Sequence, residues 1–83
     1  MTVGETLSRA RRKRKLSVED VAADTRIRAT LIEAIEADHY QLCGGAVYAR
    51  GHIRSIARVV GVDAAPLIDE FDAINHVEKP VAA

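Results

Sequence analysis

The feature that most constrains this chain is a helical apolar periodicity that is broken at short intervals. Apolar residues recur three or four positions apart through most of the sequence, and no stretch alternates as a half-buried strand would. A serine suited to helix capping, Ser17, and helix-breaking glycines at Gly44, Gly45 and Gly61 divide the pattern into short segments. The sequence therefore predicts an all-α fold, a compact five-helix bundle.

The expected helices lie at about residues 3–14, 17–25, 28–37, 47–60 and 66–75. Ser17 can cap the second helix, and Asp20 can return the hydrogen bond, as in a capping box. Gly61 can end the fourth helix in the left-handed conformation. In the fifth helix, the apolar stripe is formed by Leu67, Ile68, Phe71 and Ile74. We expect a loop at residues 38–46, and we divide the chain into one domain, 1–75, and the start of a linker or tail, 76–83.

The chain is small and contains few groups suited to chemistry. No glycine-rich phosphate cradle or Ser-His-acid arrangement is present, so we expect no enzymatic activity. His39, Cys43 and His52 lack the paired spacing of structural zinc sites, so we expect no metal and no cofactor. No apolar run reaches membrane-spanning length and no signal peptide opens the chain. We therefore expect this piece to be soluble and intracellular.

The net charge of the chain is zero, but the charged residues are unevenly distributed along it. Residues 9–15 contain six positive charges and no negative ones, whereas residues 17–38 contain six negative charges and two positive ones. Nucleic-acid binders usually have a net basic footprint. This chain instead has local basic segments on a neutral body, which is compatible with solvated helix faces or with a charged partner.

The stretch LSVEDVAADTRIRATLIEAIEAD resembles the helix-turn-helix of Cro and phage-repressor regulators. The matching positions are Leu16, Ser17, Val21, Ala22, Ile27, Ile32, Ile35 and Glu36. The resemblance implies a helix-turn-helix topology and an ion pair between Arg11 and Glu36. We interpret that pair as structural, because a half-buried charge needs a partner.

A longer stretch, GETLSRAR…YARGHIRSIARVVGVD…LIDEFD, is similar to the N-terminal cytoplasmic domain of RodZ-like proteins, most of all actinobacterial members. The resemblance implies a domain of the bacterial cell-shape apparatus on the cytoplasmic face of the inner membrane. It also implies a membrane anchor in a segment absent here. Family members carry two aromatic residues at the positions of His52 and Ile56, which the resemblance implies bind the actin-like filament protein MreB. Neither is aromatic here, so the same contact chemistry is not expected.

The alternative function is DNA binding by a Cro-type transcription regulator. The resemblance implies base-facing side chains at Ala29, Thr30 and Ala34, beside Arg28. Alanine can meet only a thymine methyl, whereas strong direct readout uses arginine, lysine, asparagine or glutamine. Glu33 would repel phosphates. The remaining candidates for DNA contact, Arg11, Arg12 and Lys13, belong to the basic run and can bind phosphates without sequence preference. We therefore expect nucleic-acid binding to be weak at most.

The expected fourth helix has three faces. One is an apolar stripe, and a second carries Arg50, Arg54 and Arg58 at intervals of four, which suits solvent, an acidic partner, phosphates or anionic lipid. The third carries His52, Ile56 and Val59. An apolar patch edged by charge is typical of a contact site, although Ile56 and Val59 would also suit a wider core stripe. The predicted surface for a cytoskeletal or cell-envelope protein partner is Tyr48, Arg50, His52, Arg54, Ile56 and Val59.

Overall fold

The computed structural model describes residues 1–75 and contains six helical elements in that range, with no strand among them. The elements are α1 (Val3–Lys13), α2 (Val18–Thr25), α3 (Ala29–Glu36), a short 3-10 helix η1 (Tyr40–Cys43), α4 (Ala46–Val60) and α5 (Ala64–Asn75). The all-α fold and five α-helices are confirmed, with boundaries within two or three residues of those expected. The predicted tail at residues 76–83 lies outside the described residues.

Local signals explain where the first two helices begin. Ser17 Oγ accepts a hydrogen bond from Asp20 N–H at 3.0 Å, and the Asp20 carboxylate accepts one from Ser17 N–H at 2.9 Å. This is the predicted capping box, and the hydrogen bond from Ser17 N–H lowers the pKa of Asp20 because it favours the charged carboxylate. Thr2 and Glu5 form a second capping box on α1, which the sequence analysis missed.

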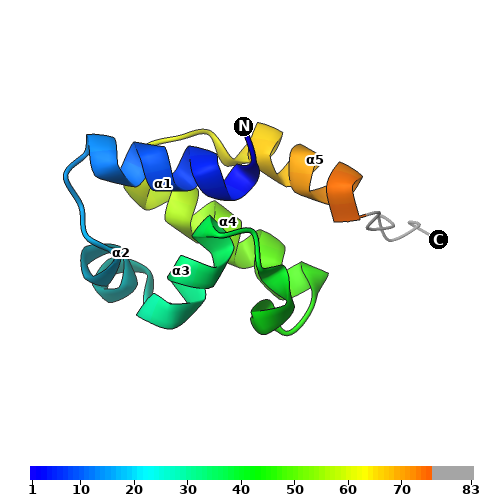
Figure 1. Ribbon diagram of the computed structural model, residues 1–83, viewed down its shortest axis with the longest axis horizontal. Helices are drawn as coiled ribbons and strands as arrows, with labels where there is room; N and C mark the ends of the chain where they lie inside the picture. The colour runs from blue at the N-terminus through cyan, green and yellow to red at the C-terminus, as the bar shows by residue number, and fades with distance from the viewer. Residues whose placement is uncertain (76–83) are drawn as a thin grey trace.

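Helix α4 is the centre of the packing. It contacts α1, α2, η1 and α5, while α3 packs against α1, α2 and η1. In Figure 1, α2 and α3 lie on one side of α1, and α5 runs to the opposite end of the molecule. The fully buried side chains of the core come from four helices and include Leu7, Val21, Ile32, Ile35, Ile53 and Ile56.

The segment between α3 and α4 differs from the expected loop. Tyr40–Cys43 form one turn of 3-10 helix that packs on α3 and α4. Gly44 and Gly45 both have positive φ, 83° and 140°, so the chain can turn sharply into α4 there. Cys43 is buried in the core, and burial raises the pKa of its thiol. The two glycines were recognised correctly, but the apolar packing that orders the preceding turn was not.

Candidate functional site: helix-turn-helix face and α4 surface

The helix-turn-helix consists of α2, a tight turn and α3. Arg26 in the turn is left-handed, with φ 61° and ψ 24°, a conformation that glycine adopts more readily. Arg28 precedes α3 and is exposed, as are Thr30 and Glu33 along the helix, while Ala29 is partly exposed. Ala34 is buried in the core, so the expectation that it faces DNA was wrong. The accessible face of α3 therefore offers one hydroxyl and one carboxylate.

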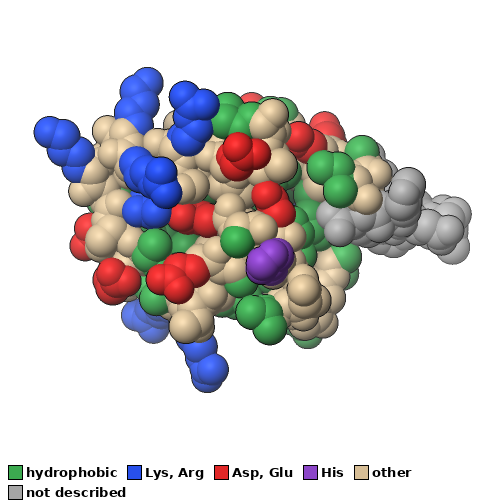
Figure 2. Space-filling model, viewed as in Figure 1, with side chains coloured by type: hydrophobic (Ala, Val, Ile, Leu, Met, Phe, Trp, Pro, Cys, Tyr) green, Lys and Arg blue, Asp and Glu red, His purple; other side chains and the backbone are tan. Residues whose placement is uncertain are grey.

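The other candidate DNA contacts lie elsewhere. Arg12 and Lys13 are exposed on α1 and border a hollow that contains no residue of α3. Arg28 and Thr30 line a separate hollow with His52. Figure 2 shows Lys and Arg side chains gathered over α1 at one end of the visible face, with Asp and Glu side chains below them over α2 and α3. The basic run and the reading helix thus form two different surfaces.

Arg11 is separated from the rest of the basic run by its contacts. Its Nε and Nη2 donate to the two carboxylate oxygens of Glu36 at 2.7 and 2.9 Å, and its Nη1 donates to the carbonyl of Leu16 at 2.9 Å. The hydrogen bonds to Glu36 raise the pKa of the guanidinium. Three directed contacts on a mostly buried side chain join α1, the following turn and α3. The geometry therefore agrees with the structural interpretation of the pair.

The predicted α4 face is divided between surface and core. Ile56 is fully buried, so its assignment to an exposed contact face was wrong, and Val59 is only partly exposed and packs against the core. The reason is that α4 is covered on several sides, so its apolar stripe is wider than one row. Tyr48 and Arg54 are exposed, and His52 is partly exposed.

Arg50 is also less available than its spacing suggested. Its Nε donates to Asp72 on α5 at 2.8 Å, and its Nη2 is buried without a hydrogen-bond partner within residues 1–75. The sequence predicts that Arg50, Arg54 and Arg58 share one face of the helix, where they cannot neutralise one another. Asp72 supplies a partner for Arg50 across the α4–α5 interface, while Arg54 and Arg58 remain exposed.

The end of η1 and the start of α4 carry exposed apolar side chains that were not predicted together from the sequence. Leu42 is 67% exposed, Val47 75% and Tyr48 63%. Leu42 and His52 line the same hollow, and Tyr48 lies one helical turn before His52. We call Leu42, Val47, Tyr48, His52 and Arg54 the α4 surface. The sequence alone does not indicate that Leu42 and Val47 are exposed, because their exposure depends on how η1 packs against α3 and α4.

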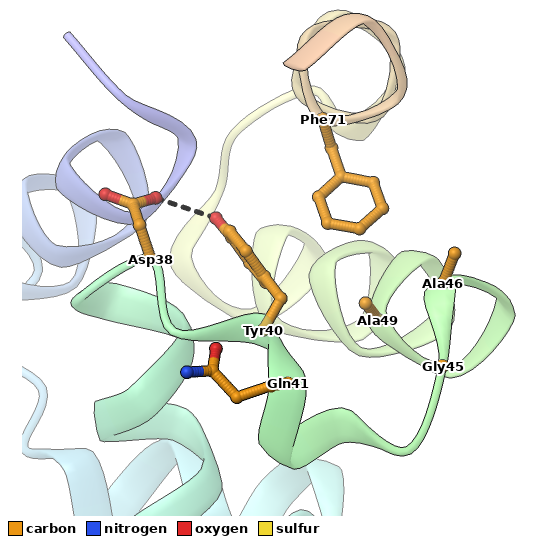
Figure 3. A pocket seen from close by; sticks show the side chains of 7 residues that line it. All are labelled: Asp38, Tyr40, Gln41, Gly45, Ala46, Ala49 and Phe71. Atoms are coloured by element: carbon orange, nitrogen blue, oxygen red, sulfur yellow. Dashed lines mark hydrogen bonds between the residues drawn. The ribbon is translucent and has the colours of Figure 1, made fainter. Parts of the chain in front are cut away.

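A third hollow, of about 530 Å³, opens beside Tyr40, between η1, the start of α4 and α5 (Figure 3). The Tyr40 hydroxyl donates to Asp38 at 2.8 Å, and the Tyr40 ring meets the ring of Phe71 edge to face with centroids 4.9 Å apart. Burial and the bond to Asp38 raise the pKa of Tyr40 well above its usual range. Asp38 also accepts a hydrogen bond from Gly4 N–H at 2.9 Å. Its carboxylate therefore links the start of α1 to the start of η1.

Residues 1–75 contain neither a candidate metal site nor a candidate membrane span. No three of His, Cys, Asp and Glu converge there in a way that could hold a metal ion. None of the helices over the same residues combines the length and apolar character needed to span a bilayer.

Comparison with known proteins assigns the family. The family described as helix-turn-helix domain matches residues 6–67. The cytoskeleton protein RodZ of Streptococcus pneumoniae (strain ATCC BAA-255 / R6) is 31% identical over 72 residues, which cover 87% of this chain and 26% of the relative. The chain thus spans about a quarter of that relative's length. No solved structure matched. The family match covers most of the chain, the five α-helices agree with it, and the similarity to RodZ extends over nearly the same residues. The chain therefore belongs to the helix-turn-helix domain family and is RodZ-like.

Proposed function

We propose that this chain is a non-enzymatic binding module that contacts a protein partner of the bacterial cytoskeleton or cell envelope. The S. pneumoniae relative is a cytoskeleton protein, and the similarity covers most of this chain. In this proposal the full-length protein is anchored in the inner membrane through a segment absent here, and the domain lies on the cytoplasmic face. No cofactor takes part.

The observation that carries the proposal is the apolar exposure at the start of α4. Five large apolar side chains are exposed among the described residues, and Leu42, Val47 and Tyr48 are three of them. Exposed apolar groups that cluster and are bordered by charge typically mark a protein contact. Arg54 supplies such a charge, and His52 supplies a polar group one turn from Tyr48.

The α4 surface replaces the wider surface predicted from sequence. Tyr48, His52 and Arg54 remain in it, and Leu42 and Val47 are added because they are exposed. Ile56 is removed because it is buried, Val59 because it packs on the core, and Arg50 because it pairs with Asp72. An aromatic ring surrounded by smaller apolar groups is a common form of binding hot spot.

The test is co-sedimentation of the domain with filaments of the actin-like protein from the same organism. Tyr48→Glu is expected to weaken binding by about tenfold or more, because a charge would enter a desolvated contact. Ile74→Glu is the matched control: Ile74 is 61% exposed, but it lies on α5 beside the start of α1. Equal effects of the two substitutions, or none from Tyr48→Glu, would contradict the proposed surface.

A Cro-type DNA-binding function is the second candidate, favoured by the exposed Arg28 and Thr30 at the start of α3. It has less support, because Glu33 is exposed on the same helix and would face phosphate groups. Ala29 offers no hydrogen bond to a base. We therefore rank the protein-binding function first.

A further inference from the structure

One side of α1 carries a set of cations that the proposed function does not use. Arg9, Arg12 and Lys13 are spaced by three and four residues, so they share one face of the helix. They border a single open hollow together with Met1 and Ala10. We call Arg9, Arg12 and Lys13 the α1 ridge. In Figure 2 the Lys and Arg side chains over α1 extend away from the body of the molecule.

The ridge cations are not committed to the fold. All three residues are exposed, and within residues 1–75 the side chains of Arg12 and Lys13 have no ion-pair or hydrogen-bond partner. Arg9 Nη1 lies 3.4 Å from the sulfur of Met1. Glu5 is the acid on this side of α1, and its carboxylate accepts from Thr2 N–H in the capping box. The ridge is therefore a free positive surface.

The neighbouring basic residues show the contrast. Arg11 is paired with Glu36, and Arg14 lies over the end of α4 with its Nη1 3.5 Å from the carbonyl of Val59. These two side chains hold α1 against other elements. The ridge residues make no such contact, so their charges are available to bind an external group of opposite charge.

The exposed thioether beside these cations distinguishes two kinds of anionic partner. Met1 is 68% exposed and borders the same hollow as the ridge. A nucleic-acid backbone uses the cations alone, whereas a bilayer surface offers phosphates beside an apolar boundary. A flat surface can also meet the edge of α1 without approaching the acidic side chains over α2 and α3.

We propose that the α1 ridge docks on an anionic phospholipid bilayer, with Arg9, Arg12 and Lys13 against headgroup phosphates and Met1 at the acyl boundary. Basic residues near an anionic leaflet each add to the attraction, and the attraction decreases as salt screens it. This surface is separate from the α4 surface. Lipid contact and protein contact can therefore be lost independently.

The test is co-sedimentation of the 83-residue chain with phosphatidylcholine vesicles that contain roughly 30% phosphatidylglycerol, a density sufficient for an anionic surface potential. We expect binding to these vesicles, little binding to pure phosphatidylcholine, and loss of binding at about 0.5 M salt. The ridge variant Arg9→Gln/Arg12→Gln/Lys13→Gln is expected to bind about tenfold less tightly or weaker still.

The matched control is Arg26→Gln/Arg28→Gln/Arg58→Gln, which removes the same charge from exposed positions elsewhere. It is expected to keep most of the binding, and circular-dichroism melting checks that both variants fold. Equal loss in the two variants would overturn the ridge assignment. The lipid proposal would also be overturned if anionic vesicles gave no binding, or if a random-sequence DNA duplex bound through the ridge more tightly than vesicles at equal phosphate concentration.

Discussion

Arg11 and Glu36 form a two-point ion pair that joins α1 to α3. The two N–O distances are 2.7 and 2.9 Å, and the side chains are 12% and 10% exposed. Both contacts are charge-assisted, so they fix the relative position of the two helices as well as neutralising both charges. Because Arg11 also donates to Leu16, the turn before α2 is held by the same side chain.

The first prediction compares the two glutamates of α3. Glu36→Ala is expected to reduce the free energy of unfolding by about 3–5 kcal/mol, because it leaves a mostly buried guanidinium without its partner. Glu33→Ala, at an exposed position, is expected to change it by no more than about 0.5 kcal/mol. Urea unfolding of both variants measures the difference. Similar midpoints would show that the pair contributes little to stability.

The second prediction compares two helical glycines. A Cβ on Gly4 would lie 2.5 Å from the carbonyl oxygens of Ile35 and Glu36, whereas a Cβ on Gly51 would meet nothing within 4 Å. Gly4→Ala is therefore expected to destabilise the domain by about 1–3 kcal/mol through overpacking. Gly51→Ala is expected to stabilise it by about 0.5–1 kcal/mol through helix propensity. Thermal melts that shift in the same direction for both would contradict the close approach of α1 to α3.

The third prediction concerns the turn of the helix-turn-helix. Arg26 has a positive φ of 61°, so its backbone is strained, and its exposed side chain makes no hydrogen bond or ion pair among the described residues. Arg26→Gly is expected to stabilise the domain by about 0.5–1 kcal/mol, because relief of the left-handed strain exceeds the extra entropy of glycine in the unfolded chain. Arg28→Gly is the control, since Arg28 has a negative φ of −59°. A higher melting temperature for Arg28→Gly than for Arg26→Gly would refute this reasoning.

The fourth prediction concerns DNA. We expect weak binding without sequence preference, and we expect Arg28→Ala and Thr30→Ala to change it little, because the exposed face of α3 lacks groups for bidentate base contacts. The measurement is fluorescence anisotropy with unrelated duplexes over a range of salt concentrations. Nanomolar affinity for one duplex at physiological salt, lost in Thr30→Ala, would instead support the transcription-regulator function.

The sequence by itself determined the helices and several of their ends. Ser17, Asp20 and Gly61 act through neighbours in the chain, so their capping roles could be predicted from local spacing. The Arg11–Glu36 pair spans 25 residues, and it was available only through the resemblance to phage-repressor regulators.

The tertiary structure decided which helix faces are covered. Ile56, predicted on a contact face, is fully buried, whereas Ile74, predicted in the apolar stripe of α5, is 61% exposed. Periodicity gives the direction of each side chain around its own helix, whereas burial depends on whether another element lies opposite. Helix α4 is covered on several sides, while the last turn of α5 extends to one end of the molecule (Figure 1). The contact of Arg50 with Asp72 likewise depends on how α4 and α5 cross, which no spacing within either helix specifies.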